Sequence, residues 1–380
     1  MPRTPADVSS VLFACLARLA LATVGVLAAA ASGGGEASAD AAAERDRDGG
    51  LVRSDFLARS TDGQRIAVRE VRAAGRLSGD PVILLHGARV PGVASFDLPV
   101  ANGSLAADLA NRGLRVFIMD VRGFGASSRP TEMSRPPEGT RPLVRSDEAV
   151  RDVGAAVDAV RSRTGERQVA LLGWATGGHW AGMYASQQPA KVDNLVIYNS
   201  LYGPIDGHPT LGRGSDNEDP QRPGYFNEGA FGGYRLNTAA SLLPSWDSSI
   251  PTDDKSQWRD PQVAKAYMQA ALDSDPTSSS RSPASFRAPS GPMEDSFYLA
   301  TGRQLWDAST ITARTLIVRS ERDFWSRPED VTTLQRHLVR AREVRTLQIP
   351  QATHYVHLDR PERGRAALIA GLEAFLTAKR

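Results

Sequence analysis

Three segments of this 380-residue chain carry residues that together could attack a carbonyl carbon. The stretch Gly173-Trp174-Ala175-Thr176-Gly177 has the spacing of G-x-S-x-G, a sharp turn that presents a nucleophile at its tip. Asp323 and His354 each follow an apolar run further along the chain. An imidazole oriented by a carboxylate can take a proton from a nucleophile and return it to a leaving group. The chain order is therefore turn, acid, base.

Ala175 occupies the position where this motif has its serine, and a methyl group cannot attack a carbonyl. The surrounding sequence is otherwise intact, because the apolar run 169–172 precedes the turn and the helix-like segment 179–185 follows it. Glycines on both sides allow the sharp bend. Two explanations stay open: a serine was replaced by alanine to disarm the site, or the gene itself encodes alanine.

Other groups are weaker candidates for the chemistry. Thr176 lies one residue beyond the tip, so its side chain should point away from His354. His354 could instead activate water or abstract a substrate proton directly. Glu321 is the rival acid and His357 the rival base.

The backbone after the strand 82–85 is the candidate for stabilising negative charge. Here His86-Gly87-Ala88 forms a turn, and the N–H groups of Ala88 and Thr176 would make an oxyanion hole. Asp120 follows the next strand, and we expect it to order nearby loops. The candidates for substrate binding are His86, Trp174, Tyr202 and Trp246.

Short apolar runs alternate with helical patterns from Leu51 onward, which indicates an α/β fold with a mostly parallel sheet. Strands are expected at 56–60, 65–71, 82–85, 116–119, 169–172, 195–197, 316–318 and 344–349. Helices are expected at 104–112, 146–164, 177–188, 328–341 and 362–378. These strands and helices predict an α/β core made of two segments, residues 51–200 and 313–380.

The intervening stretch 201–312 is rich in Pro, Ser, Gly and Asp and contains scattered aromatic residues. It is too long for a bare loop, so we predict an inserted cap or lid. Its aromatic side chains either line an apolar pocket or pack the cap onto the core.

The N-terminus has the pattern of a secretory signal, predicted to span 1–39 and to be followed by a disordered linker, 40–50. Arg3 precedes the apolar run 19–31, and Ala37-Ser38-Ala39 offers a cleavage site. An uncleaved membrane anchor is the alternative, although Arg18 leaves the run short for a span. We expect a secreted or periplasmic protein with no stable membrane insertion after cleavage.

Composition excludes several kinds of site. The net charge is +2 with both signs interspersed, which argues against a nucleic-acid-binding groove. Cys15, in the predicted signal, is the only cysteine, so the rest of the chain can form no disulfide and no thiolate metal site.

Taken together, these motifs resemble the α/β-hydrolase fold superfamily from about Arg53 to the C-terminus. The matching pieces are His86-Gly87, Asp120 to Gly125, Gly173 to Gly178, Asp323 and His354 to Pro361. The resemblance implies a doubly wound, mostly parallel eight-stranded sheet with a cap after the sixth strand, and hydrolysis without a metal or organic cofactor. It implies a carboxylic ester hydrolase, here for a small or medium apolar acyl substrate. A non-catalytic ligand-binding protein is the alternative.

Overall fold

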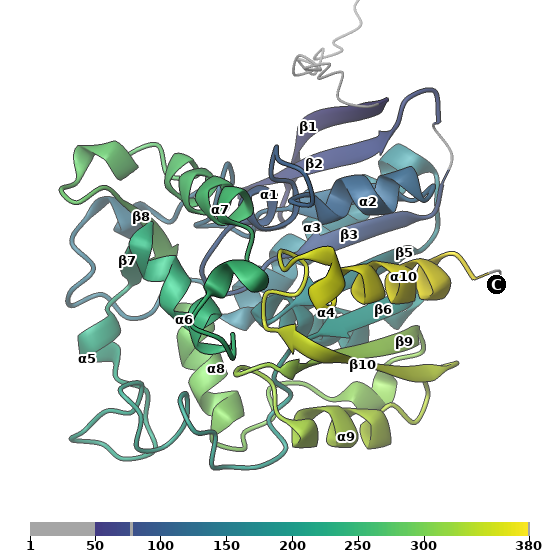
Figure 1. The fold of residues 1–380 in the computed structure, drawn as a ribbon. Helices are drawn as coiled ribbons and strands as arrows, with labels where there is room; N and C mark the ends of the chain where they lie inside the picture. Colours follow the sequence, from purple (N-terminus) through teal and green to yellow (C-terminus); the bar gives the residue numbers. More distant parts are fainter. Residues whose placement is uncertain (1–49, 77–78, 379–380) are drawn as a thin grey trace, which may run out of the picture. The chain divides into compact units, whose positions relative to one another are not determined.

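An eight-stranded sheet forms the centre of the fold in the computed structural model, which describes residues 50–76 and 79–378 (Figure 1). These residues belong to one unit, Ala41–Arg380. The predicted export signal (1–39) and all but the last residue of the predicted linker (40–50) lie outside the described residues.

The strand order is β1-β2-β4-β3-β5-β6-β9-β10. Only β1–β2 and β2–β4 pair antiparallel, and the five other pairs are parallel, so the predicted mostly parallel, eight-stranded α/β fold is confirmed. The strands are β1 (Leu51–Arg59), β2 (Arg65–Ala73), β3 (Pro81–Leu85), β4 (Arg115–Met119), β5 (Val169–Trp174), β6 (Val192–Tyr198), β9 (Arg314–Arg322) and β10 (Val344–Thr353).

Helices cover both faces of this sheet, because its central strands are apolar on both faces. Along β3, Val82 and Leu84 pack in one core cluster with α2 and α10, whereas Ile83 and Leu85 pack in a second cluster with α3, α4 and α9. The core helices are α1 (Gly92–Phe96), α2 (Leu105–Asn111), α3 (Ser146–Thr164), α4 (Thr176–Gln187), α9 (Pro328–His337) and α10 (Arg365–Leu376).

The last helix begins later than predicted. Residues 361–363 form a separate 3₁₀ turn, and Gly364, with φ of 109°, breaks the chain direction before α10 starts at Arg365. A β-carbon at this glycine would lie 2.8 Å from the Ala352 methyl. Close packing against β10 therefore interrupts an otherwise helical sequence pattern.

The register of the parallel strands brings the ends of β3, β5 and β6 to one edge of the sheet. Leu85 pairs with Gly173, and Trp174 pairs with Tyr198. The chain after β3 continues to β4 on one side, whereas β5 lies on the other, which makes β3 the point where the strand order reverses. Ligands of open α/β sheets bind at the carboxyl ends of strands beside such a point.

An irregularity in β10 sets which residues meet at this edge. Ile349 pairs with Ser320 but Thr353 pairs with Arg322, so four steps along β10 match two along β9. Gln351 has a positive φ of 58° here, and its N–H donates to the Glu321 carboxylate at 2.6 Å. Without this bulge the register would place Ala352, and not His354, opposite Asp323.

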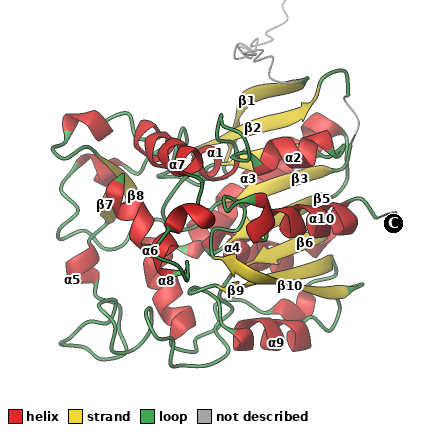
Figure 2. Cartoon of the chain, viewed as in Figure 1, coloured by secondary structure: helices red, strands yellow, loops and turns green. Residues whose placement is uncertain are grey.

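The segment between β6 and β9 contains the predicted insertion, residues 201–312, and holds its own secondary structure. A separate two-stranded antiparallel sheet joins β7 (Tyr234–Thr238) to β8 (Ser285–Pro289) (Figure 2). The helices are α5 (Glu228–Phe231), α6 (Leu243–Ser248), α7 (Pro261–Asp273) and α8 (Gly291–Ala300). The insertion contacts the core through Trp246, whose indole N–H donates to Asp359 at 2.8 Å. Its boundaries and its role as a cap remain predictions.

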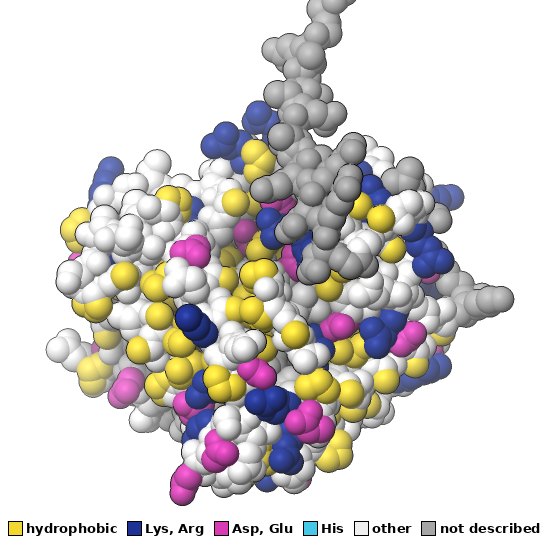
Figure 3. Space-filling model, turned by 45° about the horizontal axis from the view of Figure 1, so that its top comes forward, with side chains coloured by type: hydrophobic (Ala, Val, Ile, Leu, Met, Phe, Trp, Pro, Cys, Tyr) yellow, Lys and Arg dark blue, Asp and Glu magenta, His cyan; other side chains and the backbone are white. Residues whose placement is uncertain are grey.

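The surface carries both signs of charge. On the face seen in Figure 3, Lys and Arg side chains alternate with Asp and Glu, and neither sign forms a continuous region. Within residues 50–76 and 79–378, no helix is both long and apolar enough to cross a membrane.

A pH-dependent contribution to stability should come from Asp359. Burial raises the pKa of this carboxyl from 3.8 to about 6, although Trp246 and Thr353 donate to it. Asp359 thus binds its proton more tightly in the folded protein than in the unfolded chain. Protonation therefore adds to the free energy of unfolding at low pH, and this contribution is lost as the pH rises through about 6. Between pH 7 and pH 5 the parent should gain roughly 1 kcal/mol relative to Asp359→Asn, measured by urea unfolding. An identical pH dependence in the two proteins would contradict this assignment.

Candidate active site

The bend at Ala175 joins β5 directly to α4. Ala175 is the single residue between them and adopts φ 53° and ψ −121°, a region that residues with a β-carbon rarely occupy. Its N–H donates to the Tyr198 carbonyl at 2.9 Å, and its carbonyl accepts from the Gly178 N–H at 3.0 Å. The strained turn is therefore held by hydrogen bonds on both sides.

The positions on either side of the bend leave no space for a side chain and therefore require glycine. A β-carbon at Gly173 would collide with the Gly177 carbonyl, and one at Gly177 would collide with the Leu85 carbonyl at the end of β3. These contacts pack the turn tightly against its neighbours. The predicted turn-and-helix motif is thus present in its full backbone form, with alanine at the tip.

Asp323 and His354 form a buried pair at the ends of β9 and β10. The His354 Nδ1 atom lies 2.6 Å from the Asp323 Oδ1 atom, and the two side chains are 5% and 0% exposed. Such a carboxylate fixes the imidazole with its proton on Nδ1 and leaves Nε2 to act as a base.

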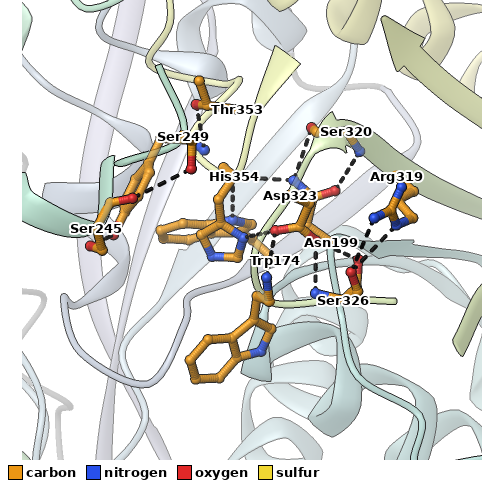
Figure 4. Close-up of polar contacts among 12 residues, drawn as sticks. Trp174, Asn199, Ser245, Ser249, Arg319, Ser320, Asp323, Ser326, Thr353 and His354 are labelled. Atoms are coloured by element: carbon orange, nitrogen blue, oxygen red, sulfur yellow. Dashed lines mark hydrogen bonds and ion pairs between the residues drawn. The ribbon is translucent and has the colours of Figure 1, made fainter. Parts of the chain in front are cut away.

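The Asp323 carboxylate is itself held by backbone and hydroxyl donors (Figure 4). The N–H of Trp325 donates to Oδ1 at 3.1 Å, and the N–H of Ser326 donates to Oδ2 at 2.9 Å. The Ser326 hydroxyl also donates to Oδ2. These hydrogen bonds fix the orientation of the carboxylate, which suits a group that must position an imidazole.

His354 is anchored through its backbone to the ends of β5 and β6. Its carbonyl accepts hydrogen bonds from Trp174 Nε1 at 3.1 Å and from Asn199 Nδ2 at 3.2 Å (Figure 4). The Tyr198 hydroxyl donates to the same carbonyl at 3.3 Å. The Trp174 ring also lies 5.1 Å from the imidazole, centroid to centroid. Because Trp174 immediately precedes Ala175, these contacts join the histidine to the bend.

The turn after β3 lies against the same bend. A β-carbon at Gly87 would stand 3.4 Å from the Ala175 methyl carbon. His86 is fully buried: its Nδ1 donates to the Gly87 carbonyl at 2.7 Å, and its Nε2 accepts from the Val121 N–H at 3.1 Å. Burial lowers the pKa of His86, so it is neutral and shapes the turn.

The two predicted oxyanion donors are Ala88, in this turn, and Thr176, the first residue of α4. The first N–H groups of a helix have no partner inside the helix and carry partial positive charge. The Thr176 hydroxyl is buried and makes no hydrogen bond within the described part of the chain. The oxyanion role of both residues remains a prediction.

The structure gives the rival residues other partners. Glu321 is exposed and binds the backbone of the β10 bulge. His357 is buried with its Nδ1 next to the Tyr198 hydroxyl at 3.1 Å, and burial lowers its pKa well below 6.5. Asp120 accepts from the N–H groups of Gly92 and Ala126, and so orders loops as expected.

Two predicted substrate-binding residues are engaged in packing. The Tyr202 hydroxyl lies 2.9 Å from Nδ1 of His337, and its ring packs against Trp306 in the second core cluster. Trp246 is fully buried and stacks on Tyr355 with 5.0 Å between ring centroids. For both residues, as for His86 and Trp174, substrate contact stays a prediction.

Sequence reasoning missed Asn199, which links three strand ends. It follows β6 with a φ of 48°, donates to the Ser320 hydroxyl and the His354 carbonyl, and accepts from the Ser320 N–H. A buried polar residue directly after an apolar strand was the available signal. Within the described ranges, no three His, Cys, Asp or Glu side chains are grouped to hold a metal ion.

Residues 80–361 match the family model described as the alpha/beta hydrolase fold. Because this match covers more than half of the chain, the protein belongs to the α/β-hydrolase fold family.

Curated relatives match over shorter stretches. A (lyso)-N-acylphosphatidylethanolamine lipase of Mus musculus is 33% identical over 125 residues, which are 33% of this chain and 31% of the lipase. An abhydrolase domain-containing protein of Caenorhabditis elegans is 32% identical over 117 residues, 31% of this chain and 22% of the relative. The chain thus spans less than a third of the length of either.

Among solved structures, an E-2-(acetamidomethylene)succinate hydrolase superposes with a TM-score of 0.56 at 17% identity, covering 86% of this chain and all of the other. At this identity the likeness concerns the fold. The fold and the relatives together identify a hydrolase family with lipase-type members.

The strain at position 175 gives a stability prediction. Replacing Ala175 by glycine should stabilise the protein by about 1 kcal/mol, because glycine adopts this φ and ψ without a clashing β-carbon. The matched control is Ala181→Gly in the middle of α4, which should destabilise by about 1 kcal/mol. Urea unfolding measures both, and a loss of stability in Ala175→Gly would show that the bend is not strained.

Proposed function

We propose that this chain has the active-site architecture of a carboxylic ester hydrolase in which Ala175 occupies the nucleophile position. The observation that carries the proposal is the buried Asp323–His354 pair, with the histidine tied through Trp174 to the bend at Ala175. The lipase-type relative agrees with ester chemistry. As the chain stands, it lacks the attacking oxygen and is inactive toward ordinary esters.

With a hydroxyl at position 175, the reaction would proceed in the usual two halves. His354 Nε2 takes the hydroxyl proton as the oxygen attacks the ester carbonyl, and Asp323 stabilises the imidazolium. The Ala88 and Thr176 N–H groups receive the charge that develops on the carbonyl oxygen. The proton then passes to the leaving alcohol, and water repeats the sequence to release the acid.

Without that hydroxyl, the same pair still offers a base. General-base help to a water molecule is worth roughly 10²–10⁴-fold, far below what a serine hydrolase achieves. The bend, the pair and the turn after β3 remain a shaped site that could hold a ligand without turnover. A ligand-binding role is therefore the alternative function, and Ala175 itself is the observation that favours it.

Substrate and location complete the proposal. Aromatic residues surround His354; the Phe324 ring, for example, lies 4.8 Å from the imidazole, centroid to centroid. They favour a small or medium apolar acyl group. The N-terminal pattern favours export to the periplasm or the medium. N-terminal sequencing of the mature protein tests this, and an intact Met1 in the exported fraction would contradict signal cleavage.

Restoring the hydroxyl tests the enzymatic proposal. Ala175→Ser should hydrolyse p-nitrophenyl butyrate with a kcat/KM at least about 10³-fold above the parent, since nucleophile and base act as a unit. Adding His354→Ala to the serine variant should return activity to the parent level.

The matched control is His337→Ala in the serine variant, which changes a histidine on α9 and should leave kcat/KM within about 3-fold. A serine variant no faster than the parent, with an unchanged unfolding transition, would favour the ligand-binding alternative. Equal losses in the His354 and His337 variants would remove His354 from the mechanism.

A further inference from the structure

Two arginines at the turn after β3 have no acidic partner among the residues that the structure describes. Arg89 directly follows Ala88, and its guanidinium donates to Asn237 Oδ1 and to the Ser241 hydroxyl, each at 2.8 Å. Both acceptors are neutral and belong to the insertion. The positive charge of Arg89 is thus held in place but not neutralised.

Arg235, on β7, points to the same turn. Its Nη2 donates to the Ala88 carbonyl at 3.0 Å, whereas its Nε–H is buried and has no hydrogen-bond partner in the described part of the chain. Burial and the nearby Arg89 charge lower the pKa of Arg235 to about 9, so it is still protonated at neutral pH. Arg89 and Arg235 are both only partly exposed, and two neighbouring cations repel each other unless an anion binds between them.

Several other arginines with little exposure are paired with carboxylates. Arg122 binds Asp152, Arg287 binds Asp275 at 2.7 Å, and Arg327 binds Asp330 at 2.9 Å. These guanidinium groups are neutralised, but Arg129 is not: its Nη2 donates to the Ser274 carbonyl at 2.9 Å, and its Nε has no hydrogen-bond partner in the described part of the chain. Arg89 and Arg235 differ from Arg129 in that Arg89 lies in the turn after β3 and Arg235 contacts it, next to the candidate active site.

The position of the two charges relates them to the bend. Ala88 is both the acceptor for Arg235 and a predicted oxyanion donor, and the adjacent Gly87 lies against the Ala175 methyl. Arg89 contacts two residues of the predicted insertion and Arg235 belongs to the insertion, so both charges lie where the insertion meets the turn after β3.

We propose that Arg89 and Arg235 bind a carboxylate at the far end of the acyl group, so that the ligand of this site is a monoester of a short dicarboxylic acid. This inference rests on the proposed function in one respect, that the acyl group occupies the site beside Ala175. Guanidinium groups bind carboxylates through charge-assisted hydrogen bonds, and the unused Nε–H of Arg235 supplies such a donor. The remaining acyl carbons meet the aromatic side chains around His354.

The parent chain can test this by equilibrium binding, because it lacks the serine that would consume an ester. Calorimetry compares benzyl hydrogen glutarate, an anion, with its neutral methyl ester, and the succinate and adipate homologues vary the chain length. The anion should bind at least about 10-fold more tightly than its neutral counterpart at one of these lengths. Arg235→Gln keeps a donor for the Ala88 carbonyl but removes the charge, and should reduce this preference to below about 3-fold.

Arg222→Gln is the matched control, because Arg222 is an exposed arginine of the insertion paired with Asp219, and the preference should persist. Arg89→Gln and Arg235→Lys keep the test decisive if Arg235→Gln does not fold: the first should weaken the preference and the second should retain most of it. Equal binding of anion and neutral ester by the folded parent overturns the proposal, as does an unchanged preference in the folded Arg235 and Arg89 glutamine variants.

The outcome for catalysis is separate. A parent that prefers the anion, together with an inactive Ala175→Ser protein, would contradict ester hydrolysis while leaving the carboxylate site in place. An active serine variant with no preference for anionic esters would support ester hydrolysis and contradict the carboxylate site.

Discussion

The pairing of Asp323 with His354 depends on the bulge in β10. The parallel register alone would carry Ala352 to this place, and the two extra residues move His354 there instead. The cost of a positive φ at Gln351 is offset by a hydrogen bond to Glu321, a residue outside the site. The Glu321 carboxylate on the neighbouring strand thus stabilises the backbone conformation that positions His354, although its hydrogen bonds are made to Gln351 and not to the candidate catalytic residues.

The rest of the site is also built largely from backbone positions. The bend at Ala175 is held by main-chain hydrogen bonds and by glycines that leave no space for a β-carbon. The His354 carbonyl is held by donors from the ends of β5 and β6. None of these contacts needs a hydroxyl at position 175, so the scaffold keeps its form when the attacking atom is absent.

Much of this arrangement could be predicted from sequence, because buried parallel strands are apolar runs and their ends meet at one edge of the sheet. That reasoning located the bend, Asp323 and His354, and the eight-stranded sheet followed from the family resemblance. It named Asp323 as the acid with Glu321 as its rival, but it could not foresee the β10 bulge that brings His354 opposite Asp323. It also missed Arg235, whose partner Ala88 lies far away in the chain and is recognised only through its backbone oxygen.

The contact between Trp246 and Asp359 limits how the insertion could move away from the core. Lifting α6 from the core would break the indole hydrogen bond and separate the stacked rings of Trp246 and Tyr355, although it would also return to water a carboxyl group whose ionised form burial disfavours. A rigid outward movement of the whole insertion would therefore have to break these contacts. A movement confined to loops far from α6 would leave them intact.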